Sequence, residues 1–576
     1  MKKITTAFLI LFIGLSLASQ AQAPGWAWAK NGGGAGDEAG KSIANDLNGN
    51  VFMTGFFRSK TIQFGAITLA NTDTTGNTDD IFLVKYDSAG TLLWAKSFGG
   101  RGDDEGSSLS TDYMGNVYLT ANFTSLTLKV GFITLTNANT DSLSLNYDGF
   151  TAQFSSLGNV IWAKRFGNIG DDNINGISTD LVGNTYITGS FNSDTVYFDT
   201  LKVVSDGSVN LFIAKLNLFG DVVWAKSAGG NMEDKSLAIA TDSIGNIAIT
   251  GYFFSNSIAF DNFVLHKKDT SGSVSGGYTN DIFTTKYNPL GNVMWAKSAG
   301  GSNLYVDDIS SNSVAMSSKG EVYITGYFRY DSLYFDSLKL YSSFESRDVF
   351  VAKYNSGGSI MWAKRAGDNL DDEGRGIAVD KLGNIYVAGY FSNDTIAFDS
   401  VSLTGHSLDA EIYVVKISPA GTVIWAKSAG GVNGDFCNAV SAFDINKVYI
   451  TGQYYSSYIA FDGSVVTNQA IGDVFVARLY PITVGLPAYT DLSAELIIYP
   501  NPAAQYSTIK YSLKYPASVS IEIYNELGEK VSAIISRELQ SEGEYNYIFS
   551  AAHSGIYFVK LQTSEGVLVK RIIFSK

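Results

Sequence analysis

The tripeptide Trp-Ala-Lys recurs along most of the chain at a nearly constant interval. From one tryptophan to the next there are 62 to 71 residues, and the string WAKSAGG occurs unchanged at 224–230, 295–301 and 425–431. A period of this length exceeds one coil of a solenoid and suits a repeat of four strands. The chain is therefore expected to repeat one small antiparallel sheet. The tryptophans of the repeat are Trp28, Trp94, Trp162, Trp224, Trp295, Trp362 and Trp425.

Two further signatures fall once in each period. One reads DLNGNVFMTG at 46–55, and the other reads DIFLVKYDSAGTLLWAK at 80–96. Asp followed three residues later by Gly marks a type I turn whose positive-φ position glycine fills. Each repeat is thus interpreted as strands a to d, with short a–b and c–d turns at one end of the sheet. The longer b–c and d–a connections then share the other end, and b–c segments such as VYFDTLKV at 196–203 predict an extra hairpin.

The two ends of the repeat array complement each other. A d-like strand, WAWAK at 26–30, precedes the first repeat, and the seventh repeat stops at a c-like strand, DVFVARLYP at 473–481. Pairing these strands completes a seventh sheet and removes the exposed edges. The sequence therefore predicts an all-β fold whose main part is a seven-bladed β-propeller closed by N- and C-terminal strand exchange. Two smaller β domains are the alternative.

The repeats of the form Asp-x-x-Gly-Asn-x-Tyr-x-Thr-Gly resemble the SBBP β-propeller repeats of secreted bacterial proteins. The resemblance covers about residues 26–482, and residues 22–482 are assigned to the propeller domain. It implies the propeller fold and leaves the function open.

The N-terminus has the pattern of a secretory signal peptide, residues 1–21. Lys2 and Lys3 precede an apolar run and then small residues. Cleavage fits after Ala21 or after Ala23. The second choice would place Pro24 directly after the cut bond, where it offers no N–H to the protease, so Ala21 is favoured. No other apolar stretch reaches membrane length, and the lone Cys437 excludes an intramolecular disulfide.

The period is lost at a linker, 483–494, before a domain at 495–576. Alternation in VSIEIYNELGEKV at 519–531 predicts two strands and a hairpin of a small, immunoglobulin-like β-sandwich. YPNP at 499–502, GIYFVKL at 555–561 and the basic, apolar terminus resemble the C-terminal sorting domain of type IX secretion substrates. That resemblance implies the type IX machinery as a partner and location outside, or on the outer membrane of, a Gram-negative bacterium, by release or lipopolysaccharide attachment. An ordinary immunoglobulin-like binding module is the alternative.

The net charge and the absence of known catalytic motifs argue against several classes of function. With 41 basic and 55 acidic residues the net charge is −14, which argues against nucleic-acid or anionic-membrane partners. The three histidines lie in unrelated places, and no metalloprotease, nucleophile-elbow, dithiol or phosphate-loop motif occurs. No catalytic residue is assigned, and the chain is expected not to be an enzyme.

Acidic, glycine-rich loops follow the tryptophan strands and are the best candidates for a ligand site. Carboxylates on such loops suit Ca²⁺, and DDNING at 171–176 matches the first half of a calcium loop, although Val182 stands where a glutamate is needed. The alternative is that the acids cap turns and keep the surface soluble. No other cofactor is indicated. The candidate ligand or calcium residues are Asp37, Glu38, Asp103, Asp104, Glu105, Asp171, Asp172, Asn173, Asn175, Asp371, Asp372 and Glu373.

The leading hypothesis is a secreted or cell-surface, non-enzymatic propeller whose variable face binds a glycan or a protein. A secreted polysaccharide hydrolase or lyase and a purely structural surface protein are the alternatives. The tryptophans are expected to fill the gap against the neighbouring sheet. The paired glycines that follow are expected to allow a turn that other residues cannot make.

Overall fold

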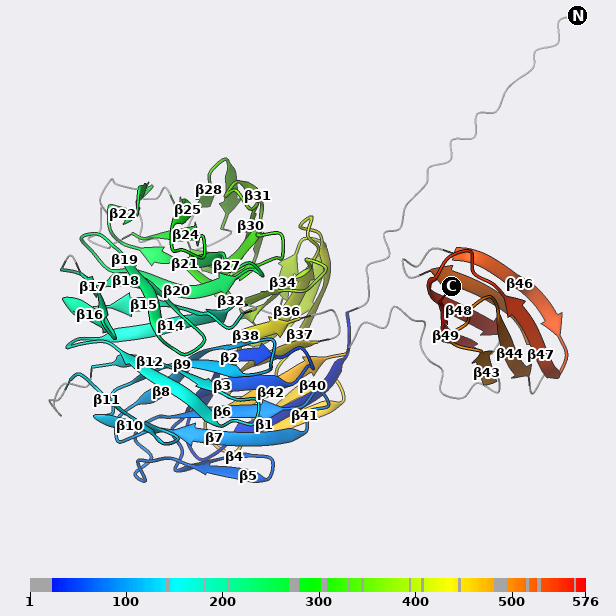
Figure 1. Ribbon diagram of the computed structural model, residues 1–576, viewed down its shortest axis with the longest axis horizontal. Helices are drawn as coiled ribbons and strands as arrows, with labels where there is room; N and C mark the ends of the chain where they lie inside the picture. Colours follow the sequence, from blue (N-terminus) through cyan, green and yellow to red (C-terminus); the bar gives the residue numbers. More distant parts are fainter. Residues whose placement is uncertain are drawn as a thin grey trace, which may run out of the picture. The chain divides into compact units, whose positions relative to one another are not determined.

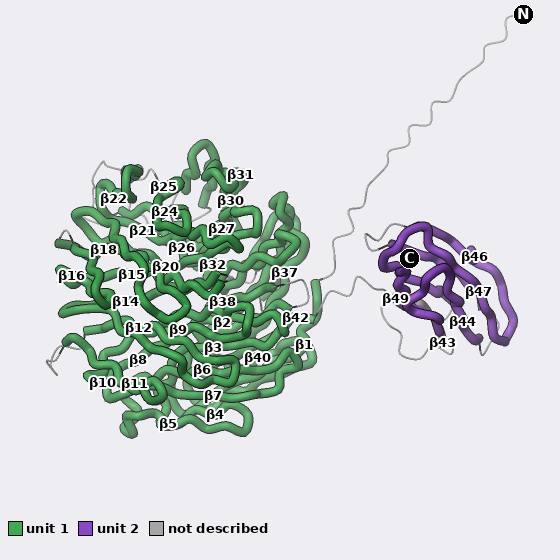
Figure 2. The backbone as a smooth tube through the Cα atoms, viewed as in Figure 1, with its two compact units in different colours: residues 1–481 green, residues 482–576 purple. Residues whose placement is uncertain are grey.

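A computed structural model divides the protein into two compact units, Met1–Pro481 and Ile482–Lys576 (Figure 2). The predicted signal peptide with its cleavage site at Ala21 and the predicted linker at 483–494 lie outside the described residues. Every regular element of the described residues is a β-strand. The structure describes residues 23–139, 146–180, 182–205, 207–268, 279–301, 308–329, 332–342, 346–392, 395–405, 409–443, 447–480, 495–513, 517–525, 530–563 and 566–575.

In the first compact unit, antiparallel sheets of four strands follow one another along the chain (Figure 1). We number these main sheets 1 to 7 and give their strands in order from one edge to the other. Sheets 1 and 2 consist of β2 (Glu38–Asn45), β3 (Val51–Phe57), β6 (Asp80–Tyr86) and β7 (Leu92–Phe98), and of β8 (Asp104–Thr111), β9 (Val117–Phe123), β12 (Asp148–Phe154) and β13 (Val160–Phe166). Sheets 3 and 4 consist of β14 (Asp172–Thr179), β15 (Thr185–Phe191), β18 (Asn210–Leu216) and β19 (Val222–Ala228), and of β20 (Asp234–Thr241), β21 (Ile247–Phe253), β24 (Asp281–Tyr287) and β25 (Val293–Gly300). Sheets 5 and 6 consist of β26 (Ile309–Met316), β27 (Val322–Arg329), β30 (Arg347–Tyr354) and β31 (Ile360–Ala366), and of β32 (Asp372–Val379), β33 (Ile385–Phe391), β36 (Glu411–Ile417) and β37 (Val423–Ala429).

Sheet 7 joins the two ends of this unit. It consists of β38 (Asp435–Ala442), β39 (Val448–Tyr454), β42 (Asp473–Leu479) and β1 (Trp26–Gly33). In the antiparallel register Trp28 faces Arg478, and the Tyr480 N–H donates to the Gly25 carbonyl at 2.7 Å. The first strand therefore pairs with the last c-like strand, as the sequence predicts.

The first strands of the sheets form a closed circle. Each contacts the first strand of the next sheet in the order β2, β8, β14, β20, β26, β32 and β38, and β38 contacts β2. The fourth strand of each sheet lies at the opposite edge, so it is peripheral. The Trp-Ala-Lys strands are these outer strands. The arrangement is propeller-like.

A two-stranded hairpin follows the second strand of each sheet, in agreement with the sequence. Hairpins 1 to 7 are β4 (Thr61–Phe64) with β5 (Ile67–Ala70), β10 (Thr127–Val130) with β11 (Ile133–Thr136), β16 (Thr195–Phe198) with β17 (Leu201–Val204), β22 (Ser257–Phe260) with β23 (Phe263–His266), β28 (Ser332–Phe335) with β29 (Leu338–Tyr341), β34 (Thr395–Phe398) with β35 (Val401–Thr404), and β40 (Tyr458–Phe461) with β41 (Ser464–Thr467). Strand β4 pairs with β1, and β28 pairs with β25. A hairpin thus lies against the outer strand of the preceding sheet.

The cores of this unit lie between neighbouring sheets. One core cluster combines Phe52 and Leu83 of sheet 1 with Leu119 and Phe150 of sheet 2. The third strands are almost continuously buried because both faces of a sheet are covered, and β6, β12 and β24 are buried at every position. This explains why the sequence of a third strand, such as DIFLVKY, is an apolar run rather than an alternation.

The second compact unit has two antiparallel sheets that share one core. One sheet contains β43 (Glu495–Tyr499), β44 (Ser507–Leu513) and β47 (Gly543–Phe549), and the other contains β46 (Lys530–Gln540), β45 (Ala517–Asn525), β48 (Gly555–Thr563) and β49 (Gly566–Phe574). Ile509, Tyr511, Ile521 and Val559 from both sheets are buried in the same cluster. The segment 519–531 contributes to the paired strands β45 and β46 as predicted, and its predicted turn lies outside the described residues.

Candidate ligand-binding site

The repeated tryptophans join neighbouring sheets. The Trp94 indole N–H donates to the Ser156 carbonyl at 3.3 Å, in the turn between the third and fourth strands of the next sheet. Gly158 of that turn packs on the same indole. Four of the indoles are buried and three are half-buried, so the ring faces are used for packing rather than presented to a ligand. The same bond runs from Trp28 to Ser88, Trp162 to Leu218, Trp224 to Pro289, Trp295 to Ser356 and Trp362 to Pro419.

Where a glycine pair follows an outer strand, close approach requires it, which corrects the expectation of an unusual turn at these pairs. Gly99 and Gly100 are not among the residues with positive φ. A Cβ on Gly99 would overlap the carboxylate of Asp80, and one on Gly100 would overlap the Ser125 side chain. The glycines therefore let the crossing strand pass directly over a buried carboxylate and a buried hydroxyl.

The second acid of each acidic loop is the first residue of an inner strand and is buried. Asp104 accepts hydrogen bonds from the Gly100 N–H and the Ser125 hydroxyl, both at 2.7 Å. Glu38 accepts from the Ser59 hydroxyl, and Asp172 accepts from the Ser193 hydroxyl. Burial raises the pKa of Asp104 to about 8 and that of Glu38 to about 7. Asp372 is equally buried, and burial raises its pKa to about 8. These acids therefore fix the crossings between sheets. The sequence-based hypothesis expected them on the surface, and the structure places them in the interior.

The first acid of each loop is more exposed and also has a structural partner. Asp103 accepts the Asp79 N–H at 3.2 Å, and Asp171 accepts the Tyr147 N–H at 3.0 Å. Asp371 accepts the Arg347 N–H at 3.0 Å, while Asp37 accepts from the Tyr455 hydroxyl at 3.1 Å. These carboxylates tie a loop to the start of a third strand or to a neighbouring aromatic residue.

The calcium-loop pattern at 171–176 is placed on a strand. Asn173 and Asn175 lie in β14, and the Asn175 amide donates to the Ser236 carbonyl of the next sheet at 2.9 Å. Glu105 is half-buried, and burial raises its pKa while Lys41 opposes the rise. Within the described ranges, no group of three or more His, Cys, Asp or Glu side chains is arranged to hold a metal ion.

A ring of β-bulges that the sequence-based predictions missed lies on the inner strands. In each main sheet the register of the first strand against the second shifts at one residue, for example at Lys41, Ser107 and Arg375. A bulge re-aims one side chain and is frequent beside functional sites. The bulged residues are Lys41, Ser107, Asn175, Leu237, Asn312, Arg375 and Asn438.

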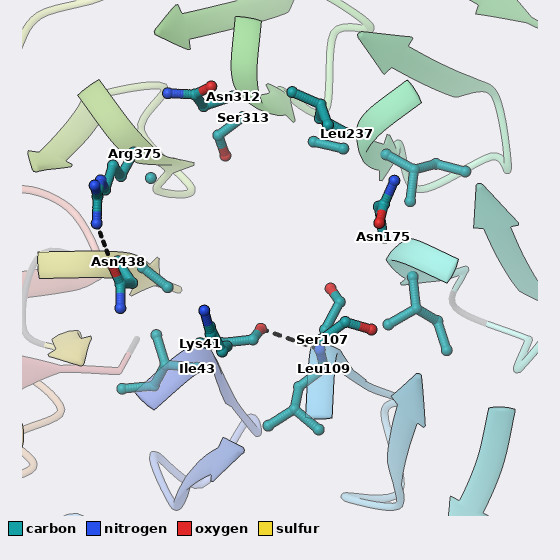
Figure 3. A pocket seen from close by; sticks show the side chains of 18 of the residues that line it. Lys41, Ile43, Ser107, Leu109, Asn175, Leu237, Asn312, Ser313, Arg375 and Asn438 are labelled. Carbon is teal, nitrogen blue, oxygen red and sulfur yellow. Dashed lines mark hydrogen bonds between the residues drawn. The ribbon is translucent and has the colours of Figure 1, made fainter. Parts of the chain in front are cut away.

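These side chains surround a central channel (Figure 3). The channel is lined by the bulged residues and the one or two residues after each, and it encloses about 240 Å³. Asn312 donates to the Gly374 carbonyl at 3.0 Å, and Asn438 donates to the Gly40 carbonyl at 2.8 Å, so an amide at this position links one inner strand to the next. The sequence contains a signal that could have identified the bulged position. The residue at this position varies widely from repeat to repeat, whereas the residues on either side of it are similar.

Three bulged residues do not make this bond to a backbone carbonyl of the next inner strand. Leu237 has no polar atom, and Lys41 is exposed in the channel. Arg375 donates to the Asn438 amide oxygen at 2.8 Å and to Glu373 at 3.1 Å, and its guanidinium lies 4.7 Å from the Tyr390 ring centroid. The channel therefore carries two cations in a chain that is acidic overall.

The Arg375 side of the channel continues into a charged and aromatic cluster. Glu373 also binds Arg347 at 2.5 Å, and Arg347 in turn binds Asp308 at 2.7 Å. The Tyr390 ring packs edge-on against Phe436 at 4.9 Å. Glu373, a candidate from the sequence, is only 4% exposed and is thus buried between two arginines.

Comparison with known proteins agrees with this architecture. Residues 161–194 and 362–390 match the family model described as a beta-propeller repeat, and residues 497–575 match the secretion system C-terminal sorting domain. The chain carries β-propeller repeats and a secretion-system sorting domain. The sorting domain is of the type IX kind, so this propeller protein is secreted or exposed on the cell surface. None of the described residues form a helix long and apolar enough to cross a membrane.

Two curated relatives show similarity to the propeller protein. An uncharacterized WD repeat-containing protein of Acanthamoeba polyphaga mimivirus is 24% identical over 552 residues, which cover 82% of this chain and 39% of the relative. The regulatory protein FlaEY of Caulobacter vibrioides is 28% identical over 176 residues, covering 28% of this chain and 18% of the relative. The chain therefore spans well under half of either relative.

Two solved structures show weak similarity. Dimeric latent PorU from Porphyromonas gingivalis is 11% identical, covers 81% of this chain and 32% of its own, and has a TM-score of 0.13. Immunoglobulin domains 1–5 of Sidekick-1 are 8% identical, cover 68% of this chain and 92% of their own, and have a TM-score of 0.10. Neither likeness carries an argument about this protein.

Proposed function

We propose that the protein is a non-enzymatic binding module of the cell exterior. Its main sheets are the blades of one seven-bladed β-propeller, closed by the N-terminal strand β1, and its second compact unit is an immunoglobulin-like sandwich. The sandwich delivers the propeller to the type IX machinery after a signal peptide has been removed. The propeller then binds a glycan or a protein at the mouth of its central channel.

The observation that carries this proposal is the contrast between two sets of residues. The acids that recur in several repeats have partners within the fold, as Asp104 has in Gly100 and Ser125. The bulged residues occupy equivalent positions yet differ in size and charge, and they include Lys41 and Arg375. A structural role alone would favour the same small amide in every sheet, so the variation supports selection by a ligand.

The size of the channel supports binding of a protruding group. Its volume of about 240 Å³ is below the roughly 300–1,000 Å³ typical of small-molecule pockets. A single sugar unit or amino-acid side chain could enter, while the rest of a larger ligand would rest on the surrounding loops. Neither step needs a cofactor, and a calcium requirement is a separate proposal that a chelator tests.

A binding screen with a product assay tests the function. The secreted protein would be presented to a panel of polysaccharides and surface proteins, with and without a calcium chelator, and the products would be assayed for new reducing ends. We expect binding without cleavage, weakened by the double change Lys41→Ala and Arg375→Ala. Lys319→Ala, on the a–b turn of sheet 5 at the other end of the strands, is the matched control. Cleavage of a polysaccharide that is lost on changes in one repeat would replace the proposal with the hydrolase or lyase alternative.

A further inference from the structure

A lysine on an outer strand pairs with an aspartate on the next hairpin at most boundaries between repeats. The lysine is that of the Trp-Ala-Lys motif, and the aspartate occupies the hairpin turn with φ between 48° and 53°. The N–O distances run from 2.7 to 3.2 Å. Each pair thus places a carboxylate at a fixed point on the rim between two repeats. The pairs are Lys164–Asp199, Lys226–Asp261, Lys297–Asp336, Lys364–Asp399 and Lys427–Asp462.

The boundary between sheet 1 and hairpin 2 lacks this carboxylate. Gly131 stands at the aspartate position with φ +62°, so Lys96 of the outer strand has no hairpin anion to pair with. A second cation, Lys129, lies on the same hairpin, and neither lysine forms an ion pair with the described residues. Two ammonium groups therefore share a site from which the usual anion is missing.

A groove opens at this boundary. It encloses about 680 Å³ and is lined by the outer strand of sheet 1, the turn of hairpin 2 and the last turn of sheet 2. Phe132, the residue after Gly131, lines the groove and is 81% exposed. An exposed phenyl ring beside two lysines offers a flat apolar face next to positive charge.

We propose that this rim groove binds an acidic saccharide, whose carboxylate takes the place of the missing aspartate beside Lys96 and Lys129 and whose ring lies on Phe132. A uronic acid carries both required features on one residue, a carboxylate and an apolar ring face. The volume lies within the roughly 300–1,000 Å³ of typical ligand pockets. The chain as a whole has net charge −14, so the attraction of an acidic ligand to this groove depends on its two local ammonium groups.

A second boundary without the aspartate provides an internal control. Lys30 of β1 faces hairpin 1, where Gly65 occupies the turn. Ala66 and Gln63 stand there in place of Phe132 and Lys129. The boundary at Lys30 thus also lacks the hairpin carboxylate. It has neither the phenyl ring nor the second cation, so it does not form the same site.

The experiment measures binding of the full-length secreted protein to a hyaluronan tetrasaccharide by calorimetry. The matched probe is the same tetrasaccharide with its carboxylates reduced to alcohols. We expect binding of the acidic form, weakened by added salt, and no binding of the reduced form. Lys96→Ala and Lys129→Ala should each weaken binding roughly fivefold, the scale of a solvent-exposed ion pair. Phe132→Ala should weaken it as well, whereas Lys30→Ala and Lys164→Ala should leave it unchanged.

The variant Gly131→Asp tests the proposal most directly, because it restores the carboxylate that this boundary lacks. Aspartate already occupies the equivalent left-handed position at five other boundaries. At one of these, the Val293 N–H lies against the Asp261 carboxylate, and residue 131 lies beside the equivalent Val160. The new carboxylate should pair with Lys96 and abolish saccharide binding while the melting temperature is kept. Retained binding in this variant, or equal binding of the reduced tetrasaccharide, would overturn the proposal.

Two further outcomes separate the rim groove from a peptide site and from the channel. A glutamate-rich peptide that binds as tightly as the saccharide, with no effect of Phe132→Ala, would overturn the saccharide assignment. Binding that depends on Lys41 and Arg375 but not on Lys96 would overturn the rim site and leave the channel site intact. Loss on Gly131→Asp with normal behaviour of the channel variants would support the rim site alone.

Discussion

The indole N–H of Trp295 donates to the Ser356 carbonyl at 3.1 Å, and Gly358 of the same turn packs on the indole ring. Trp425 occupies the equivalent position at the boundary with sheet 7 and is also buried. No turn joins the third and fourth strands of that sheet, because β42 and β1 come from opposite ends of the repeat array. The indole nitrogen of Trp425 accordingly has no hydrogen-bond partner among the described residues. Because the N-terminal strand closes sheet 7, the hydrogen bond from the tryptophan indole to the next sheet is missing at this boundary.

Replacing either tryptophan with phenylalanine tests this difference. Trp295→Phe removes the indole N–H and leaves the Ser356 carbonyl without its donor, whereas Trp425→Phe removes an N–H that has no acceptor. Both changes reduce the buried volume by a similar amount. We expect Trp295→Phe to lower the free energy of unfolding by about 1 kcal/mol more than Trp425→Phe. Urea denaturation of both variants measures the difference, and a larger loss for Trp425→Phe would contradict it.

The glycines that pack on the tryptophans should tolerate no side chain. Gly291 has φ +82°, and a Cβ there would lie 3.0 Å from the Trp224 ring. Gly291→Ala should therefore cost about 1–2 kcal/mol for the left-handed backbone, before any loss of packing. A Cβ on Gly463 would meet no atom within 4 Å, and its φ is not positive, so Gly463→Ala should be neutral or stabilise by about 0.4–1 kcal/mol. Thermal unfolding of the two variants compares them, and equal melting temperatures would refute the assignment.

The sequence predicted the strands well and the site poorly, for physical reasons. The turn Asp46 to Gly49 and the apolar run at 81–84 are local signals, so the repeat, its hairpins and the pairing of the first and last strands could be read from letters alone. Whether a loop acid such as Asp104 faces solvent depends on the next sheet, which covers it with Ser125. The bulge at Arg375 depends on a register shift between two strands. Neither effect is visible in local composition.

Stability should fall as the pH rises from about 5 to 8. Burial raises the pKa of Asp104 to about 8, and the nearby carboxylate of Asp80 adds to the rise, while Gly100 and Ser125 oppose it. Between the usual aspartate pKa of about 4 and about 8, the folded chain keeps a proton that the unfolded chain has lost. Raising the pH therefore favours unfolding over this range.

Asp104→Asn removes this titration and keeps an acceptor for the Gly100 N–H. We expect the variant to lose less stability than the natural protein between pH 5 and pH 8. The slope is reduced rather than abolished because burial also raises the pKa of Glu38 and that of Asp372. Asp194→Asn, at an exposed position in a loop, is the control for an added asparagine. Denaturant unfolding at both pH values gives the slopes, and an unchanged slope in Asp104→Asn would exclude this residue as a source.

The aspartate of hairpin 7 should contribute more than its counterparts because it also holds the N-terminal strand. Asp462 accepts the Trp26 N–H at 2.8 Å and pairs with Lys427 at 3.0 Å. Asp399 pairs with Lys364 at 2.7 Å and occupies the same left-handed turn, with φ 53° against 50°. Changing either residue to alanine incurs a similar backbone cost and loses one exposed ion pair, worth about 0–1 kcal/mol. Asp462→Ala also loses a charge-assisted hydrogen bond to the strand that closes sheet 7, so we expect it to lower the free energy of unfolding by about 1–2 kcal/mol more than Asp399→Ala.

Hydrogen exchange tests whether the contact with Trp26 is the cause. We expect faster exchange of the β1 amides in Asp462→Ala alone. Equal protection of β1 in the two variants would show that this contact does not hold the strand.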